Sequence, residues 1–300
     1  MRATIQQGKV DLAALVARIR REFPALRFSE ARLNDTGEDH AVVLLDDRWV
    51  FRFPRTAAAA ARGASERRLL ARLAADSLVA TPQYELVSEA GDFGGYRMID
   101  GRELTGPVFS ALPRAAQERV LSQIGDFLRV LHALPAALVE GLASTEDAAW
   151  FADRFAERRA RLAEALGPTL LAAADRFYAA LPSALATRHI ALIHRDFSED
   201  HILLHPTEGR LAGVIDFTDA CLGDPAFDFS CLWAYGDWAP GLAARSYGAG
   251  AEMADILRRS RWWLTRYRID QVWWSISGAR DYDVTAIRRE LEGLFEDLDV

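Results

Sequence analysis

A short segment rich in ionisable side chains constrains the fold of this chain more than any other. It reads IHRDFSEDHILL over residues 193–204, and apolar residues flank it on both sides. The flanks predict two short buried strands, with His194, Asp196 and His201 in the connection between them. Charged groups are costly to desolvate unless they are paired or bind a ligand. The segment is therefore either a solvated turn or part of a functional site.

The first hundred residues predict a small, mostly antiparallel sheet. Several short segments have the composition of strands, and polar turns or glycines separate them. One Ala- and Arg-rich segment interrupts them with helical spacing. We expect a surface helix at 9–22, a first strand within 29–40, strands at 41–47, 48–54, 84–88 and 94–99, and a helix at 58–75.

Helices dominate the sequence after residue 100. The natural boundary between the two parts is the short connection at 99–106, which predicts an α+β chain with lobes 1–99 and 100–300. We expect helices at 113–133, 147–165 and 169–185, strands at 190–193 beside 202–204 and at 211–215, and Trp-rich helices from residue 227 onward. The final helix places Ile287, Leu291, Leu294, Phe295 and Leu298 on one apolar face, which predicts a place in the core.

The composition argues against membrane insertion and secretion. No run of 18 or more apolar residues is present, so no membrane span is expected. The N-terminal segment lacks the apolar stretch of a signal peptide. The two cysteines, Cys221 and Cys231, do not make a disulfide framework and are expected to be inert thiols. These features predict a cytoplasmic protein.

The acidic residues lie mainly in the C-terminal third. The whole chain has a net charge of −7, and residues 197–300 contain 18 Asp and Glu against 10 Arg. Nucleic-acid binding is disfavoured, because it requires a basic surface. A cationic small molecule is the partner that this charge favours.

Four features occur in the order that phosphoryl transfer requires. A cation on a strand, Arg52, is followed by an acid on the next helix, Glu66. The motif HxDxxxxH then supplies Asp196 as a base for an attacking hydroxyl, and Asp216 follows an apolar strand in GVIDF. Each feature alone has an ordinary structural explanation, such as an edge-strand arginine or a solvated helix acid. Together and in this order they indicate a kinase-type site.

The chain resembles the aminoglycoside phosphotransferase family, which has a protein-kinase-like fold. HRDFSEDHILL resembles the catalytic loop of that family, and GVIDFTDACLGDPAFDF resembles its metal-binding segment. The resemblance implies a small antiparallel-sheet N-lobe that binds nucleotide and a larger helical C-lobe with the catalytic loop and acceptor site. It implies that Asp196 is the catalytic residue and that His201 and Asp216 bind Mg²⁺. ATP or GTP would be the co-substrate.

The same resemblance assigns further roles in the two lobes. It implies that Arg52 and Glu66 form the ion pair that holds the nucleotide phosphates, and that the backbone of Arg97 and Ile99 meets the purine. It also implies that Asp228 braces the catalytic loop. His194 is interpreted as a structural histidine that pins this loop, with general acid–base catalysis as the alternative.

The sequence departs from the usual kinase pattern at three places. Arg52 stands where a lysine is usual. Arginine keeps the positive charge and can bind a phosphate through two N–H groups at once. His201 stands where many kinases have asparagine, and Mg²⁺ prefers oxygen ligands. The expected phosphate loop, NDTGEDH, contains a single glycine, Gly37. Macrolide kinases also carry arginine at the first of these positions, and antibiotic kinases of the aminoglycoside 2''- and macrolide types resemble this chain at the second.

Two observations favour different acceptors. The acidic C-terminal third favours an aminoglycoside, with Asp237 and Glu199 as candidate substrate-binding residues. Seven of the eight Trp lie at or beyond Trp150, and a cleft lined by some of them would favour a macrolide. A metabolic kinase of the choline, homoserine or sugar type and a pseudokinase without turnover remain alternatives. A monomer is expected in each case.

Overall fold

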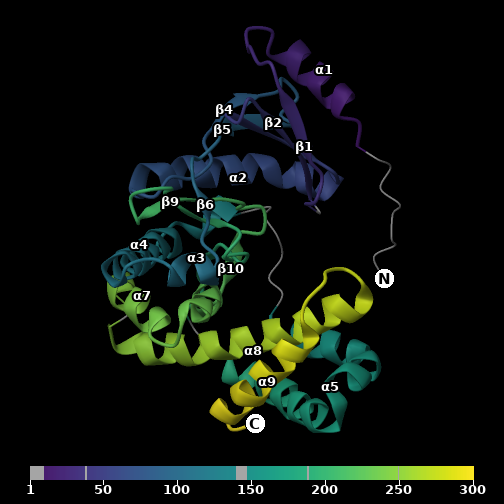
Figure 1. Cartoon of the computed structure of the whole chain (residues 1–300), viewed down its shortest axis with the longest axis vertical. Coiled ribbons are helices and arrows are strands. Elements are labelled where there is room, and N and C mark those ends of the chain that lie inside the picture. Colours follow the sequence, from purple (N-terminus) through teal and green to yellow (C-terminus); the bar gives the residue numbers. More distant parts are fainter. Residues whose placement is uncertain (1–9, 38, 140–146, 188, 249) are drawn as a thin grey trace.

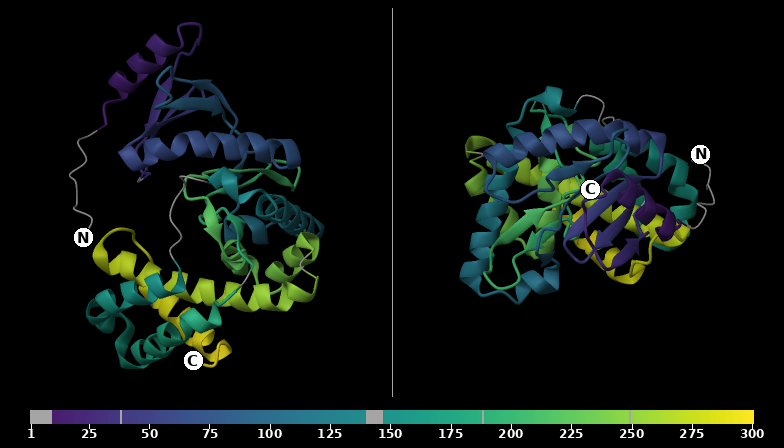
Figure 2. Two further views of the ribbon diagram at one scale, coloured as in Figure 1. Left: turned by 180° about the vertical axis from the view of Figure 1, so that it is seen from behind. Right: turned by 90° about the horizontal axis from the view of Figure 1, so that it is seen from above.

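The protein has a kinase-like fold with a small sheet-containing lobe and a larger helical part (Figure 1). The computed structural model describes residues 10–37, 39–139, 147–187, 189–248 and 250–300. The sheet and its two helices form the N-terminal lobe, and the elements from residue 102 onward form the C-terminal part. Seen from behind, α2 lies between the sheet and the C-terminal part (Figure 2).

The N-terminal lobe is built on a five-stranded antiparallel sheet in the order β1-β2-β3-β5-β4. Five strands and an inserted helix were expected, and the observed boundaries agree with the prediction to within a few residues. The elements are α1 (Leu12–Glu22), β1 (Ala31–Asn34), β2 (His40–Leu45), β3 (Trp49–Pro54), α2 (Ala57–Asp76), β4 (Tyr84–Val87) and β5 (Gly94–Arg97).

Strand β3 separates an apolar layer from a polar one. Its residues Trp49, Phe51 and Phe53 pack in one cluster with Ile19 of α1. Because side chains alternate along a strand, Arg52 points to the opposite face. That face is turned toward α2, where Arg52 meets an acidic partner. Strand β3 therefore packs against the apolar cluster with one face and carries the Arg52 guanidinium on the other.

The C-terminal part is mainly helical around short strands. One continuous core joins its helices and also includes leucines of α2. The elements are β6 (Arg102–Glu103), α3 (Gly106–Ser110), α4 (Arg114–His132), η1 (Ala136–Val139), α5 (Ala148–Ala184), β7 (Ala191–Ile193), β8 (Ile202–Leu204), β9 (Leu211–Val214), β10 (Cys221–Gly223), α6 (Ala226–Phe229), η2 (Ser230–Tyr235), α7 (Ala239–Tyr247), η3 (Gly250–Glu252), α8 (Met253–Ser277) and α9 (Val284–Asp297).

The long element α5 contains the two helices that the sequence predicts. Gly167 has φ 75° and ψ 169°, which is not a helical conformation, and Pro168 follows it. Proline removes a backbone donor and does not continue a preceding helix, so the chain changes direction here. The predicted break between 165 and 169 is confirmed.

The predicted pairing of 190–193 with 202–204 is wrong. Strand β7 instead pairs antiparallel with β10, while β8 lies between β6 and β9. Strands β8 and β9 are joined by a short hairpin, which makes them natural neighbours. The connection 194–201 is not a hairpin turn, since the strands on its two sides pair with other strands. The two flanking strands therefore belong to different small sheets.

Most of the apolar helical faces lie in the core, as expected. Ile287, Leu291, Leu294 and Phe295 of α9 are buried. The pair Trp262-Trp263 is also buried, whereas Trp273 and Trp274 are half-buried. Among the helices that the structure describes, none combines the length and the apolarity needed to cross a membrane.

Candidate active site

Arg52 is the centre of a buried polar network between the lobes. Its side chain is 6% exposed, and Nη1 donates to Glu66 Oε1 at 2.9 Å. Its Nη2 lies 2.8 Å from Asp216 Oδ1 and 2.7 Å from Thr218 Oγ1. Burial alone would lower the pKa of Arg52, but the two carboxylates outweigh it and raise the pKa well above its ordinary value. The predicted ion pair is present, and Arg52 also reaches the metal-binding segment.

His40 completes this network as a neutral acceptor. Its Nδ1 lies 3.2 Å from Arg52 Nη2. Burial and the charge of Arg52 lower the pKa of His40 to about 3, so the imidazole is uncharged at neutral pH. The guanidinium fork thus contacts acceptors on β2, α2 and the segment after β9, which a lysine could not do with one ammonium group.

Asp216 is held as a carboxylate at the end of β9. Its Oδ1 accepts from Arg52 and from Thr218 Oγ1, the latter at 2.8 Å. Desolvation alone would raise the pKa of Asp216, but Arg52 and His201 hold it well below its usual range. The residue has φ 62°, a left-handed conformation that non-glycine residues adopt at a cost. This backbone turn places the carboxylate beside residues 194–201, which we call the catalytic segment after their predicted role.

The catalytic segment brings Asp196 and His201 together. His201 Nδ1 donates to the backbone carbonyl of Asp196 at 2.8 Å and lies 3.4 Å from its Oδ2. The Asp196 side chain is 51% exposed, so an incoming hydroxyl has access to it. His201 Nε2 lies 3.9 Å from Asp216 Oδ2. The three residues that the sequence singled out therefore meet at one place.

The donor set of His201 and Asp216 fits a bridging divalent cation. His201 Nδ1 donates to the backbone carbonyl of Asp196, so Nε2 is the ring nitrogen that faces Asp216 Oδ2. Mg²⁺ usually takes one or two protein ligands and completes its shell with waters and phosphate oxygens. Among the described residues, no cluster of three metal-ligating side chains occurs. Such a site would take its remaining ligands from a nucleotide.

Asp228 braces the backbone of the catalytic segment. It is fully buried, and its carboxylate accepts from the N–H groups of His194 and Arg195 at 2.8 and 2.9 Å. His132 of α4 approaches the same carboxylate with Nε2 at 3.0 Å. These contacts hold Arg195 in a left-handed conformation at φ 68°. The arrangement matches the bracing role that the resemblance implied.

His194 is placed as a structural residue. Its side chain is fully buried, and Nε2 lies 3.0 Å from the carbonyl oxygen of Ile215. Burial lowers the pKa of His194 and favours the neutral ring. The ring therefore ties the catalytic segment to the residue before Asp216.

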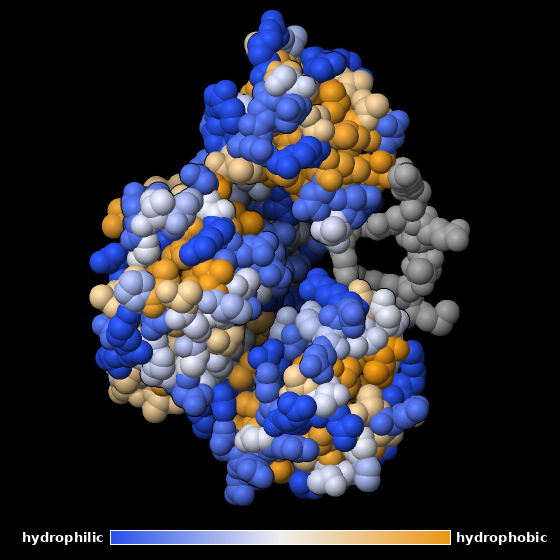
Figure 3. Space-filling model, viewed as in Figure 1, coloured by the Kyte–Doolittle hydropathy of each residue, from blue (hydrophilic) through white to orange (hydrophobic). Residues whose placement is uncertain are grey.

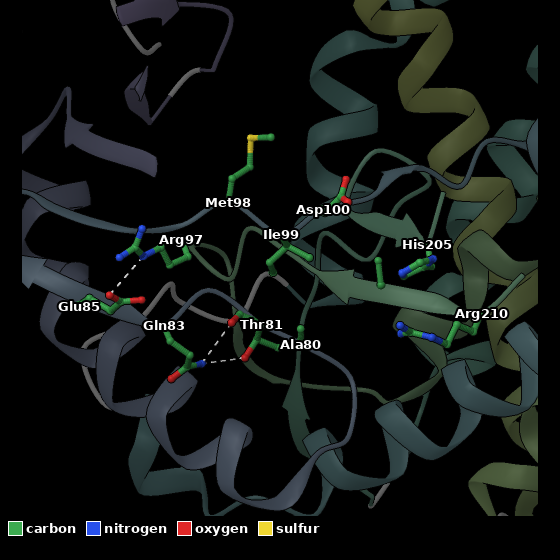
Figure 4. A pocket seen from close by; sticks show the side chains of 11 residues that line it. Ala80, Thr81, Gln83, Glu85, Arg97, Met98, Ile99, Asp100, His205 and Arg210 are labelled. Carbon is green, nitrogen blue, oxygen red and sulfur yellow. Dashed lines mark hydrogen bonds and ion pairs between the residues drawn. The ribbon is translucent and has the colours of Figure 1, made fainter. Parts of the chain in front are cut away.

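Residues 96–101 (YRMIDG), which the resemblance implies to be the hinge between the lobes, border a cavity of about 460 Å³ (Figure 4). The cavity is lined by the connection before β4, by the hinge and by the β8–β9 hairpin. The lining residues are Ala80, Thr81, Gln83, Glu85, Arg97, Met98, Ile99, Asp100, His205, Arg210 and Ala212. The Arg97 guanidinium lies 3.8 Å from the Trp49 ring, on the face of the sheet opposite Arg52. Neither Asp196 nor Asp216 lines this cavity.

The two candidate substrate-binding acids lie in different surroundings. Asp237 is 90% exposed, and its nearest cation is Arg261 at 3.9 Å. Glu199 is half-buried, and burial raises its pKa, although the backbone N–H of Gly106 at the start of α3 opposes that shift. Glu199 therefore helps to hold α3 against the catalytic segment, and its role toward an acceptor stays a prediction.

Several residues of the site were not found by sequence reasoning. Thr218 follows Asp216 by two residues, and its hydroxyl could have been noticed as a possible partner. Arg62 precedes Glu66 by four residues, so helical spacing places both on one face of α2. His40 and His132 gave no sequence pattern, because each reaches its partner through the tertiary fold.

A family model matches this arrangement. The model described as the phosphotransferase enzyme family, APH, matches residues 30–263. The chain belongs to this phosphotransferase family. The match covers the strands around Arg52, the catalytic segment and the segment after β9, so the predicted family is confirmed. A search of curated proteins gave no match.

Solved structures of similar proteins support the fold of this phosphotransferase. The GDP complex of aminoglycoside 2'-phosphotransferase-IIIa is 24% identical with a TM-score of 0.75, covering 96% of this chain and 99% of that chain. The gentamicin complex of APH(2")-IIa is 19% identical with a TM-score of 0.66, covering 97% of each chain. Macrolide 2'-phosphotransferase MphH from Brachybacterium faecium is 22% identical with a TM-score of 0.65, covering 95% and 98%.

Proposed function

We propose that this protein transfers the γ-phosphate of ATP or GTP to a hydroxyl group of a small molecule. The observation that carries the proposal is the convergence of Asp196, His201 and Asp216 beside the Arg52–Glu66 ion pair. These are the parts that phosphoryl transfer requires: a base, a metal-binding pair and a cation for the phosphates. The solved relatives include complexes with GDP, with ADP and with ATP.

Each of these side chains has a separate role in the proposed reaction. Asp196, half-exposed at the catalytic segment, accepts the proton of the acceptor hydroxyl as its oxygen attacks the γ-phosphorus. Arg52 contacts the nucleotide phosphates, and Glu66 keeps its guanidinium in place. His201 and Asp216 would hold Mg²⁺, which would neutralise charge on the phosphates. The backbone of Arg97 and Ile99 is the proposed contact for the purine.

The lobes leave space for an acceptor between them. The space-filling view shows a hollow between the N-terminal lobe and the C-terminal part, with hydrophilic residues on its walls (Figure 3). The acidic surplus of residues 197–300 favours a cationic acceptor, and an aminoglycoside is the first candidate. The solved relatives include complexes with kanamycin, gentamicin and streptomycin.

A macrolide is the second candidate, because aromatic side chains lie near Asp196. Tyr267 and Trp274 of α8 pack edge to face at 5.6 Å, and Trp274 lies 6.3 Å from Tyr282. Desolvation and the phenol of Tyr282 raise the pKa of Tyr267, and the Asp196 carboxylate contributes, which places this cluster within electrostatic reach of the base. Arg280, beside Trp274, experiences the same carboxylate. An aromatic wall with an arginine suits a large acceptor with few cationic groups.

Release of nucleoside diphosphate tests both the reaction and the acceptor. The panel contains aminoglycosides, macrolides and metabolic alcohols such as choline, homoserine and sugars, each with ATP and with GTP and with Mg²⁺ or a chelator. We expect acceptor-dependent release that needs Mg²⁺. The variant Asp196→Asn should lower the rate by about 10²–10⁴-fold while nucleotide still binds.

A change at an exposed acid outside the proposed site is the control for Asp196→Asn. Asp126→Asn, on α4, removes an exposed acid that pairs with Arg129 and should leave the rate unchanged. Equal rates for wild type and Asp196→Asn would contradict the enzyme proposal and favour a nucleotide-binding pseudokinase. Turnover of a metabolic alcohol alone would contradict both antibiotic candidates.

A further inference from the structure

Arg62 of α2 lies beside the proposed phosphate site, and the proposed reaction assigns it no role. It precedes Glu66 by one helical turn, so its side chain lies on the face of α2 that carries the Arg52 ion pair. Its Nη2 donates to Asp39 Oδ2 at 2.7 Å, and its Nη1 lies 3.6 Å from Asp219 Oδ1. Arg62 therefore bridges the connection before β2 and the segment that follows Asp216.

The two cations Arg52 and Arg62 approach the same acidic segment. Arg52 contacts Asp216, and Arg62 approaches Asp219 three residues later. The positive charge of Arg62 also contributes to lowering the pKa of His40, which contacts Arg52 directly. The two guanidinium groups thus both reach the segment 216–219, beside the residues proposed to hold Mg²⁺.

The guanidinium of Arg62 has donors that its present partners do not use. The Nε–H group is buried, and no described residue accepts a hydrogen bond from it. The contact with Asp219 is longer than a hydrogen bond, which usually spans 2.7–3.2 Å. The side chain is nevertheless 16% exposed, so a ligand entering between the lobes can reach it. Such spare donors fit the several oxygens of a phosphate group.

The connection before β2 is poor in glycine. Kinase-type sites commonly surround the phosphates with backbone N–H groups from a glycine-rich loop. Here residues 34–40 contain only Gly37, so few backbone groups can come close to a phosphate. Asp39 at the end of this connection instead holds an arginine side chain over the cleft.

We propose that Arg62 is a second phosphate-binding residue, which together with Arg52 binds the terminal phosphates of a nucleoside triphosphate. Asp39 keeps its guanidinium in position before the nucleotide arrives. The proposal rests on the proposed phosphotransferase function and replaces the missing glycine-rich loop with a side chain. Arg62 thereby discriminates triphosphates from nucleosides, which lack the group that it contacts.

Equilibrium binding of adenosine, ADP and ATP, and of the guanosine series, tests this role. In the Arg62→Gln variant we expect triphosphate affinity to fall tenfold or more, because a charge-assisted contact is lost, and nucleoside affinity to change by less than about twofold. Arg72→Gln is the matched control, since Arg72 lies on the same helix, is exposed and pairs with Asp76 one turn later. It should change neither affinity.

A second variant, Asp219→Asn, tests the inference even if Arg62→Gln fails to fold. Asp219→Asn removes a carboxylate that competes with phosphate for Arg62, so triphosphate affinity should rise. An unchanged or lower affinity in Asp219→Asn, or equal losses for nucleoside and triphosphate in Arg62→Gln, would overturn the inference. Absence of triphosphate binding by the wild-type protein would refute the proposed function as well, whereas normal binding by Arg62→Gln would refute this inference alone.

Discussion

At the scale of single residues, Asp228 has the largest structural role for one side chain. A buried carboxylate that accepts two backbone N–H groups and faces His132 is a strong local constraint. In Asp228→Asn, one oxygen becomes an amide donor that faces another donor. We expect the free energy of unfolding to fall by about 3 kcal/mol, measured by urea denaturation.

The control for Asp228→Asn is a similar change at an exposed acid. Asp126 of α4 is 58% exposed and pairs with Arg129 at 3.5 Å. Asp126→Asn should change stability by no more than about 0.5 kcal/mol. Similar stabilities for the two variants would show that the bracing of the catalytic segment contributes little.

Also at the residue scale, Asp219 predicts a pH dependence of stability. Desolvation and the charges of Asp196 and Asp39 raise its pKa to about 6, against an ordinary value of 3.8. The folded state therefore binds this proton more tightly than the unfolded state, and the stability contribution is full below about pH 4 and lost as the pH rises to about 6. The side chain is 47% exposed, so solvent screening reduces the effect.

Denaturation of wild type and Asp219→Asn from pH 4 to 7, without metal or nucleotide, measures this contribution. The wild-type protein should lose stability relative to the variant over that range, since the asparagine does not titrate. A difference that is constant with pH, or that grows in favour of wild type as the pH rises, would disprove the assignment.

At the scale of elements, helices α4 and α7 depend on a glycine for their close approach. A Cβ atom at Gly125 would overlap the carbonyl oxygen of Ala243 and crowd Ser246. Gly125→Ala should therefore force the helices apart and destabilise the protein by about 3 kcal/mol in urea, despite the better helix propensity of alanine.

Gly241 on α7 provides the matched control. A Cβ atom there meets nothing within 4 Å. Gly241→Ala should leave stability unchanged or raise it by up to about 1 kcal/mol, because alanine restricts the unfolded chain. A Gly125→Ala variant as stable as Gly241→Ala would mean that the two helices separate without cost.

At the scale of the whole molecule, the proposed nucleotide site joins the two lobes. Arg52 of the N-terminal lobe contacts Asp216 of the C-terminal part, and the backbone of Val214 donates to Ala80. A magnesium nucleotide bound between them should stabilise the folded protein by about 2.7 kcal/mol at a concentration of 100 times its dissociation constant. The midpoint of thermal unfolding should rise accordingly.

The same measurement with a chelator, or with Asp216→Asn, separates the metal from the nucleotide. We expect a smaller rise in both cases, because the phosphates lose the cation that links them to the C-terminal part. An equal rise with and without Mg²⁺ would contradict the metal-binding role of Asp216.

Periodicity and short motifs predict most of the helices and strands and the order of the functional groups. Strand and helix periods located the sheet, α2 and α4 to within a few residues, since these patterns report which side of an element is buried. The catalytic segment and Asp216 were recognisable because chemistry places them in short contiguous motifs. The Arg52–Glu66 pair followed from the resemblance and is present in the structure.

The contacts between distant residues arise from tertiary packing, which the sequence patterns do not report. His132 reaches Asp228, Arg62 joins Asp39 to Asp219, and β7 pairs with β10 and not with its neighbour in the motif. Periodicity shows that a side chain faces inward, but it does not show what lies opposite. Those partners depend on the packing of whole elements, which brings His132 and Asp228 together although they lie 96 positions apart in the sequence.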